Sequence, residues 1–221
     1  MTGTLDAGTA MATVTAQAVS TGHVVISELA VKGPGTGGTN SAGDEFVELY
    51  NPTAQLVDIG GWKIQYKSAA GTAYSDKVTI PGQTVMPAHS YFLIASSHYT
   101  GAVTPDIKLA TDLSFAADSG HVRLGDQSVG TGKVDASAVD WVGYGPNADS
   151  PEGASKAPAV PTGASNYTIE RKALPGSTQA SMASGGADAA AGNGWDSDKN
   201  GDDFLVRVTR DPQSATSPTE P

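Results

Sequence analysis

Short β-forming segments separated by turn residues constrain this chain more than any other feature. Eight segments are rich in Val, Ile, Leu, Tyr, Phe or Trp and are bounded by Gly, Pro, Asn or Asp. In one of them Trp62, Ile64 and Tyr66 alternate with polar residues, and this period of two is typical of a half-buried strand. The eight segments begin at His23, Glu45, Gly61, Ser90, His121, Val139, Tyr167 and Asp203.

The turn residues also define the fold class. Glycine and proline provide 27 and 13 of the 221 residues, whereas an average chain has roughly 12 % of the two together, and this excess disfavours a long helical bundle. We expect an all-β protein, an immunoglobulin-like antiparallel β-sandwich with long Ala/Gly-rich loop insertions at 145–166 and 176–194. We expect a flexible N-terminal tail at 1–22, one sandwich domain at 23–210 and a flexible C-terminal tail at 211–221.

Charge and composition exclude several classes of function. The formal net charge is −10, which disfavours non-specific binding to DNA or to an anionic membrane. The chain has no cysteine, which excludes disulfides, thiolate zinc sites and cysteine nucleophiles. The sequence contains no apolar run of a length that spans a membrane, so we expect no transmembrane segment. The four histidines show no spacing typical of a zinc site.

One acidic loop is the strongest candidate for a metal site. Oxygen-bearing side chains at alternate positions around Gly201 match the first half of a calcium loop. The twelfth position of such a loop needs a bidentate Glu, and here it is Arg207. The alternative is an Asx-rich turn whose side chains accept backbone N–H groups. The candidate calcium ligands are Asp196, Asp198, Asn200 and Asp202.

Two further charged groups have simpler interpretations. Glu28 and Glu48 lie on neighbouring expected strands, where we expect cross-strand ion pairs with Lys63 or Arg171. Lysines and tyrosines alternate between residues 63 and 77 and form the one modest basic and aromatic group of the chain. We expect this group to be a solvated sheet face on which the lysine stems lie against apolar surface. The alternative is a contact surface for nucleic acid.

The order of the segments resembles the lamin tail domain. The resemblance rests on VVISEL at 24–29, DEFVELYNPT at 44–53, VDIGGWKI at 57–64 and IPGQTVMPAHSYFLIA at 80–95. TIER at 168–171 and GNGWDSDKNGDDFLVR at 192–207 are similar to the closing part of bacterial members. The resemblance implies an immunoglobulin-like β-sandwich, and it covers most of residues 23–215. The two Ala/Gly-rich insertions depart from the compact family body.

The resemblance also implies a function. Lamin tail domains resemble adaptors that stand beside other domains, in bacteria often secreted nucleases or phosphoesterases. We therefore expect a non-catalytic binding module of a bacterial cell-envelope or secreted protein, with a protein partner and with calcium as the candidate stabilising ion. The Thr/Ala/Gly-rich start of the chain resembles the spacer after a cleaved signal or lipid anchor. The alternative is a nucleic-acid-binding accessory domain associated with extracellular nuclease or phosphoesterase activity.

Overall fold

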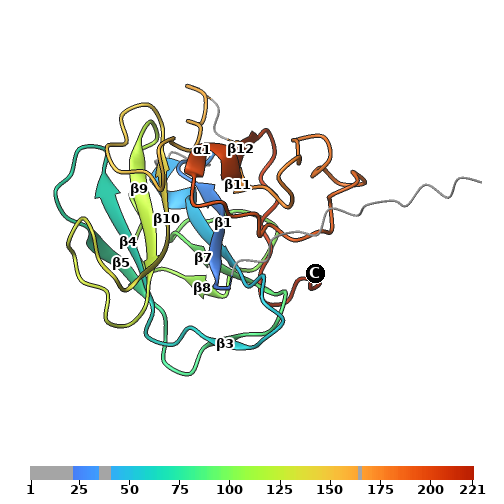
Figure 1. The fold of residues 1–221 in the computed structure, drawn as a ribbon, viewed down its shortest axis with the longest axis horizontal. Coiled ribbons are helices and arrows are strands. Elements are labelled where there is room, and N and C mark those ends of the chain that lie inside the picture. Colours follow the sequence, from blue (N-terminus) through green and yellow to red (C-terminus); the bar gives the residue numbers. More distant parts are fainter. Residues whose placement is uncertain (1–21, 35–40, 164–165) are drawn as a thin grey trace, which may run out of the picture.

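The computed structural model describes residues 22–34, 41–163 and 166–221, and in these residues the chain forms a β-sandwich (Figure 1). A six-stranded sheet has the order β12-β11-β1-β2-β7-β8, and a four-stranded sheet has the order β10-β9-β4-β5. Strands β3 and β6 form a small separate ladder. All strand pairs are antiparallel except β7 with β8. The expected all-β, immunoglobulin-like fold is therefore confirmed.

All eight segments expected from the sequence contain a strand. These strands are β1 (Val25–Ala30), β2 (Phe46–Tyr50), β4 (Lys63–Ser68), β7 (Tyr91–Ala95), β9 (Gly120–Gly125), β10 (Ala138–Tyr144), β11 (Thr168–Arg171) and β12 (Phe204–Arg207). Four others are β3 (Val57–Asp58), β5 (Ser75–Thr79), β6 (Val85–Met86) and β8 (Ile107–Lys108). The helical elements are η1 (Ser41–Asp44) and α1 (Asn200–Asp203).

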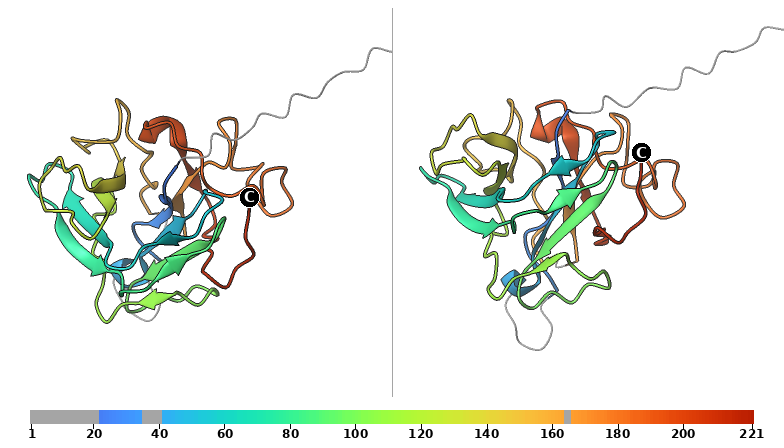
Figure 2. Two further views of the ribbon diagram at one scale, coloured as in Figure 1. Left: turned by 60° about the horizontal axis from the view of Figure 1, so that its bottom comes forward. Right: turned by 90° about the horizontal axis from the view of Figure 1, so that it is seen from below.

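The hydrophobic core lies between the two large sheets, which face each other in the views of Figure 2. Alternate residues of each strand enter it, such as Val47 and Leu49 of β2 and Val122 and Leu124 of β9. Trp62 packs against this core after a tight turn. Gly61 makes that turn with a φ of 81°, a conformation that glycine adopts without strain.

The outer faces of the sheets are also covered, so the expected alternation of buried and exposed residues fails in several strands. Every residue of β1, β2, β7 and β9 is buried. Lys67 of β4, expected to lie on a solvated face, is only 1 % exposed. Loops that return over the sheets produce this burial, and the period of two predicts only which residues share a face.

The C-terminal segment lies on the six-stranded sheet, where the sequence suggested a flexible tail at 211–221 (Figure 2). The backbone N–H of Gln213 donates to the carboxylate of Glu48, and Ser214 is fully buried. Near the end, Glu220 accepts hydrogen bonds from the hydroxyls of Tyr50 and Tyr91. The packed body therefore extends beyond residue 210. The expected tail at 1–22 lies, except for Gly22, outside the described residues.

Candidate functional site

The acidic loop runs from Asp196 into α1 and then into β12, at one end of the sandwich (Figure 1). Its candidate calcium ligands do not share one environment, because Asp196 and Asn200 are buried whereas Asp198 and Asp202 are exposed. Among the described residues, the acidic group whose ligand atoms lie within 4.8 Å of one another is Glu152, Asp196 and Asp203. Of the four predicted ligands, only Asp196 belongs to this group.

Asn200 holds the loop against β10. Its Oδ1 accepts the backbone N–H groups of Gly143 at 2.7 Å and Glu152 at 2.9 Å. Its Nδ2 donates to the carbonyl oxygen of Trp141 at 2.9 Å. Because the amide oxygen already accepts two strong donors, Asn200 acts as a structural bridge in this arrangement.

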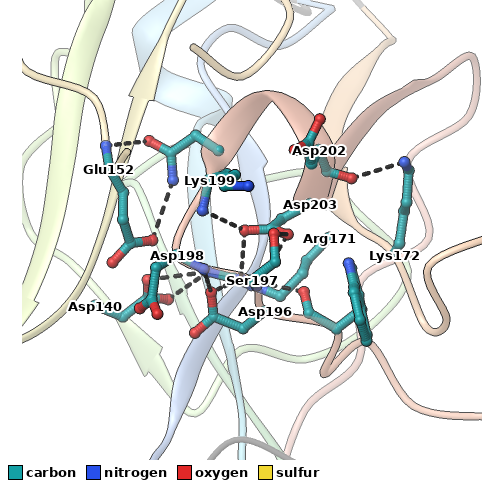
Figure 3. A network of polar contacts seen from close by, with 12 residues as sticks. Asp140, Glu152, Arg171, Lys172, Asp196, Ser197, Asp198, Lys199, Asp202 and Asp203 are labelled. Carbon is teal, nitrogen blue, oxygen red and sulfur yellow. Dashed lines mark hydrogen bonds and ion pairs between the residues drawn. The ribbon is translucent and has the colours of Figure 1, made fainter. Parts of the chain in front are cut away.

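Arg171 is the centre of the network (Figure 3). Its Nη2 donates to both carboxylate oxygens of Asp140, at 2.9 and 2.8 Å, and its Nε donates to the carbonyl oxygen of Ile26 at 2.9 Å. Its Nη1 lies 3.1 Å from Asp196 Oδ1. The guanidinium also stacks over the ring of Phe204, 4.5 Å from its centroid. The side chains of Arg171 and Asp140 are both fully buried, so this is an interior ion pair with its donors satisfied.

This ion pair joins the two sheets. Asp140 lies on β10 of the four-stranded sheet, whereas Arg171 and Ile26 lie on β11 and β1 of the six-stranded sheet. Asp140 also accepts the backbone N–H of Ile26 at 2.6 Å. The carboxylate therefore satisfies a strand N–H of one sheet from a strand of the other.

The pKa values of the remaining acids near Arg171 are shifted in different directions. Burial, and then the charges of Asp140 and Asp196, raise the pKa of Glu152 to about 9. Burial also raises the pKa of Asp203, although its carboxylate accepts the N–H and hydroxyl of Ser197. Burial opposes the ionisation of Asp196, but contacts with His23 and Arg171 outweigh it and lower the pKa of this carboxyl. Protonation of Glu152 near neutral pH and the charge of Arg171 therefore both reduce the net negative charge of the cluster.

The loop geometry matches the Asx-turn alternative. Asp196 Oδ1 accepts the backbone N–H of Asp198 at 3.1 Å, and Asp203 Oδ2 accepts that of Lys199 at 3.0 Å. Asp198 has a φ of 55°, which Asn and Asp tolerate better than most residues. The calcium site at the four sequence-derived ligands stays a prediction.

A second acidic row lies on the outer face of the six-stranded sheet. Glu28 is paired in register with Glu170 on one side and with Glu48 on the other. The expected ion pairs of Glu28 and Glu48 with Lys63 or Arg171 do not form. Instead Arg207 pairs with Glu170 at 2.9 Å. Burial raises the pKa of Glu28 to about 7 and that of Glu48 well above its usual range. Burial therefore favours the protonated forms of Glu28 and Glu48, and Arg207 offsets the charge of Glu170.

The lysines of the basic and aromatic group on the four-stranded sheet contact neighbouring side chains. Lys67 lies 2.7 Å from Asp149 with its side chain fully buried, and Lys63 lies 3.2 Å from Asp76. Lys77 lies over a tyrosine ring. A buried lysine with a carboxylate partner cannot reach a phosphate backbone, so this face offers nucleic acid fewer cations than its sequence suggests.

The described residues contain no helix with the length and apolar character needed to cross a membrane.

Comparison with known proteins identifies the family to which the chain belongs. The family model of the Lamin Tail Domain matches residues 17–146, more than half of the chain. A solved structure described as a DUF4876 family protein from Bacteroides thetaiotaomicron VPI-5482 superposes with a TM-score of 0.55 at 14% sequence identity, over 88% of this chain and 72% of that chain. A likeness at this identity shows the fold alone. No curated protein matches. The segments VVISEL, DEFVELYNPT and VDIGGWKI all fall inside the matched range, and the chain belongs to the lamin tail domain family.

Proposed function

We propose that this chain is a non-catalytic protein-interaction module of a bacterial cell-envelope or secreted protein. The observation that supports this most is the use of the acids around Arg171. Asp140, Asp196 and Asp203 accept hydrogen bonds or ion pairs from the fold itself. A general base or nucleophile must face the substrate, whereas these carboxylates face the guanidinium and backbone N–H groups that join the sheets.

The working surface in this proposal consists of the loops on the rigid sandwich, where binding residues generally lie. The insertion 176–194 packs on the scaffold, since Asn193 donates to Glu170 and Met182 is 5 % exposed. An anchored loop presents a defined shape to a partner and loses little conformational freedom on binding.

Quantitative capture tests this function. The purified chain would be immobilised and exposed to envelope and culture-medium proteins of its source organism, beside an unrelated β-sandwich of similar net charge. We expect at least one protein to be retained by this chain alone and to bind again when purified. If purified candidates bind no better to this chain than to the unrelated sandwich, the proposal is wrong.

The alternative function is an accessory domain that binds nucleic acid, and the structure shows which lysines to change in its test. Charge reversal of Lys67 would disrupt its buried ion pair with Asp149, so Lys63 and Lys77, which are only partly buried, are the residues to change. Binding to DNA near 0.15 M salt that disappears in the Lys63→Glu, Lys77→Glu variant would favour this alternative. We expect no binding to DNA at this salt concentration in either protein.

Calcium is a separate part of the proposal. The acids that lie together are Glu152, Asp196 and Asp203, and Arg171 competes with a cation for Asp196. We therefore expect weak binding, in the range of about 10⁻⁴ to 10⁻³ M that extracellular calcium modules show. The test is the unfolding midpoint in EDTA and in graded calcium, with magnesium as control. A midpoint rise that is specific to calcium and lost in Glu152→Gln is the expected result, and an unchanged midpoint at 10-fold excess over this range, about 10 mM, contradicts it.

A further inference from the structure

A pocket of about 180 Å³ opens on the outer face of the four-stranded sheet. Val122, Leu124 and Val142 of β9 and β10 point into the core, so their neighbours Arg123 and Trp141 lie on the opposite face. The connection between β9 and β10 and the loop after β10 complete the walls. The Trp141 pocket is lined by Tyr74, Arg123, Lys133, Val134, Asp135, Ala138, Trp141, Ser150 and Pro151.

The floor of this pocket is rigid. Arg123 donates to Gln65 Oε1 through Nε at 2.8 Å and through Nη2 at 2.5 Å. It also donates to the carbonyl oxygens of Gly130 and Gly132. The guanidinium stacks on the ring of Tyr74, 3.8 Å from the centroid. These contacts fix both groups before any ligand arrives, so binding requires little reorganisation.

The size of the pocket fits one ring. An engineered apolar cavity of about 150 Å³ in another protein accommodates benzene, and the Trp141 pocket is slightly larger. A disaccharide or a nucleotide would exceed this volume. The volume therefore fits a single six-membered ring or a side chain of similar size.

The polar groups around the pocket favour an aromatic ring over a sugar ring. Asp135 already accepts the backbone N–H groups of Gly130 and Ser137, and Lys133 pairs with Asp149 at 2.7 Å. The hydroxyl of Tyr74 makes no hydrogen bond to any residue that the structure describes. Each sugar hydroxyl would need its own partner on burial, whereas a phenyl or phenol ring needs at most one.

We propose that the Trp141 pocket holds one aromatic side chain, that of Tyr or Phe, which a protein partner presents. The inference rests on the proposed function as a protein-interaction module. Val134 at the rim of the pocket is 93 % exposed. A ring bound inside the pocket would leave this apolar side chain exposed. A protein partner can bury both surfaces, with the ring as the central anchor that interfaces commonly use.

The binding of an isolated ring can be measured by ¹⁹F NMR. The chain has three tryptophans, Trp62, Trp141 and Trp195, so labelling with 5-fluorotryptophan gives three signals, and Trp141→Phe assigns the relevant one. The probes are the N-acetyl amides of tyrosine, phenylalanine and leucine, together with methyl glucoside. We expect the Trp141 signal alone to shift, saturably, with the two aromatic amides and with a dissociation constant of about 1 mM.

Two filling variants locate the binding site. Ala138 lines the pocket at the start of β10, and Ala138→Leu should weaken the aromatic amides at least 10-fold. Ala138→Val, a milder change to a residue that strands favour, should weaken them by less. Leu56, which is 62 % exposed elsewhere on the surface, provides the control, and Leu56→Ser should bind as the original chain does. Unchanged Trp62 and Trp195 signals would show that each variant is folded.

The outcomes separate this inference from the proposed function. No shift of the Trp141 signal, equal binding of leucine amide or methyl glucoside, or full binding in Ala138→Leu would each overturn the aromatic pocket. If a purified partner from the capture experiment then bound Ala138→Leu unchanged, the interaction module would stand without this pocket. If the amides bind and Ala138→Leu loses the partner, both are supported.

Discussion

Removing Arg171 should reveal how much the junction between the sheets contributes to stability. In Arg171→Leu, Asp140 would keep its fully buried carboxylate and lose both guanidinium hydrogen bonds, at 2.9 and 2.8 Å. Breaking a buried pair by removing one partner costs about 3–5 kcal/mol, because the other charge stays in the interior without compensation. In a domain of this size about 1 kcal/mol corresponds to 2–4 °C, so the unfolding midpoint should fall by roughly 6–20 °C.

A double-mutant cycle separates the lost pair from general damage. Asp140→Asn keeps an oxygen that can accept the N–H of Ile26 and removes the buried charge. Adding Asp140→Asn to Arg171→Leu should therefore recover part of the loss, with a coupling energy of about 0.5–3 kcal/mol. Urea denaturation at pH 7 gives the four free energies of unfolding.

The matched control is a more exposed ion pair within the four-stranded sheet. Lys63 lies 3.2 Å from Asp76, whose side chain is 44 % exposed, and surface pairs contribute about 0–1 kcal/mol. Lys63→Met should thus change stability much less than Arg171→Leu. Equal effects of these two substitutions, or no recovery in the double variant, would refute the reasoning about the sheet junction.

Three further predictions concern ionisable side chains. Burial, helped by the charge of Lys67, lowers the pKa of His121 to about 4, so the folded state binds fewer protons than the unfolded state between pH 6.5 and 4 and should lose stability as the pH falls through this range. The free energy of unfolding should therefore depend less on pH in His121→Gln than in the original chain, and parallel pH dependences would contradict the assignment. Burial raises the pKa of Glu45 to about 8, so stability should fall as the pH rises from 4.5 to 8. Glu45→Gln keeps an acceptor for the N–H of Phe115, and its unfolding midpoint at pH 8.5 should be a few degrees higher than that of the original chain; a lower midpoint would count against this. Glu220→Ala should lower the free energy of unfolding by about 1 kcal/mol and speed proteolysis after residue 210, because Glu220 accepts a hydrogen bond from the hydroxyl of Tyr91. An unchanged rate of cleavage would mean that this contact does not hold the C-terminal segment.

The sequence predicted the strands well where they are long and apolar. Every described strand of four or more residues except β5 overlaps an expected segment. Strand β5 (Ser75–Thr79) was missed because it is mostly polar, and three of its five residues are exposed. Strands β3, β6 and β8 have two residues each, which is too few for a periodic signal. Burial of the outer faces was missed because it depends on where distant loops return.

The candidate site was predicted only in its local part. The spacing of Asp196 and Asp198 indicated either a cation loop or an Asx turn, and the structure has the hydrogen bonds of the turn. The partners that decide the chemistry, Asp140 and Arg171, are far away in sequence and enter through the fold. The parity of strand residues could have found them. Arg171 shares a face with the core residue Ile169, and Asp140 shares one with Val142. Both side chains are therefore expected to point into the core, where opposite charges must pair.

The pocket had no signal in the sequence. Tyr74, Arg123 and Trp141 come from three different segments, and their proximity depends on the register of β9 with β10 and on the loop that crosses them. A search of local motifs cannot see such a site, because each contributing residue is ordinary in its own segment.

The central claim is that the buried acids around Arg171 hold the fold together and perform no chemistry. The most direct test is a screen of the purified chain on phosphodiester, ester and glycoside substrates, with and without divalent metal ions, beside the Glu152→Gln variant. The account predicts no turnover above the uncatalysed rate in any condition. Metal-dependent turnover that a folded Glu152→Gln protein has lost would contradict it and would make the acidic cluster an active site.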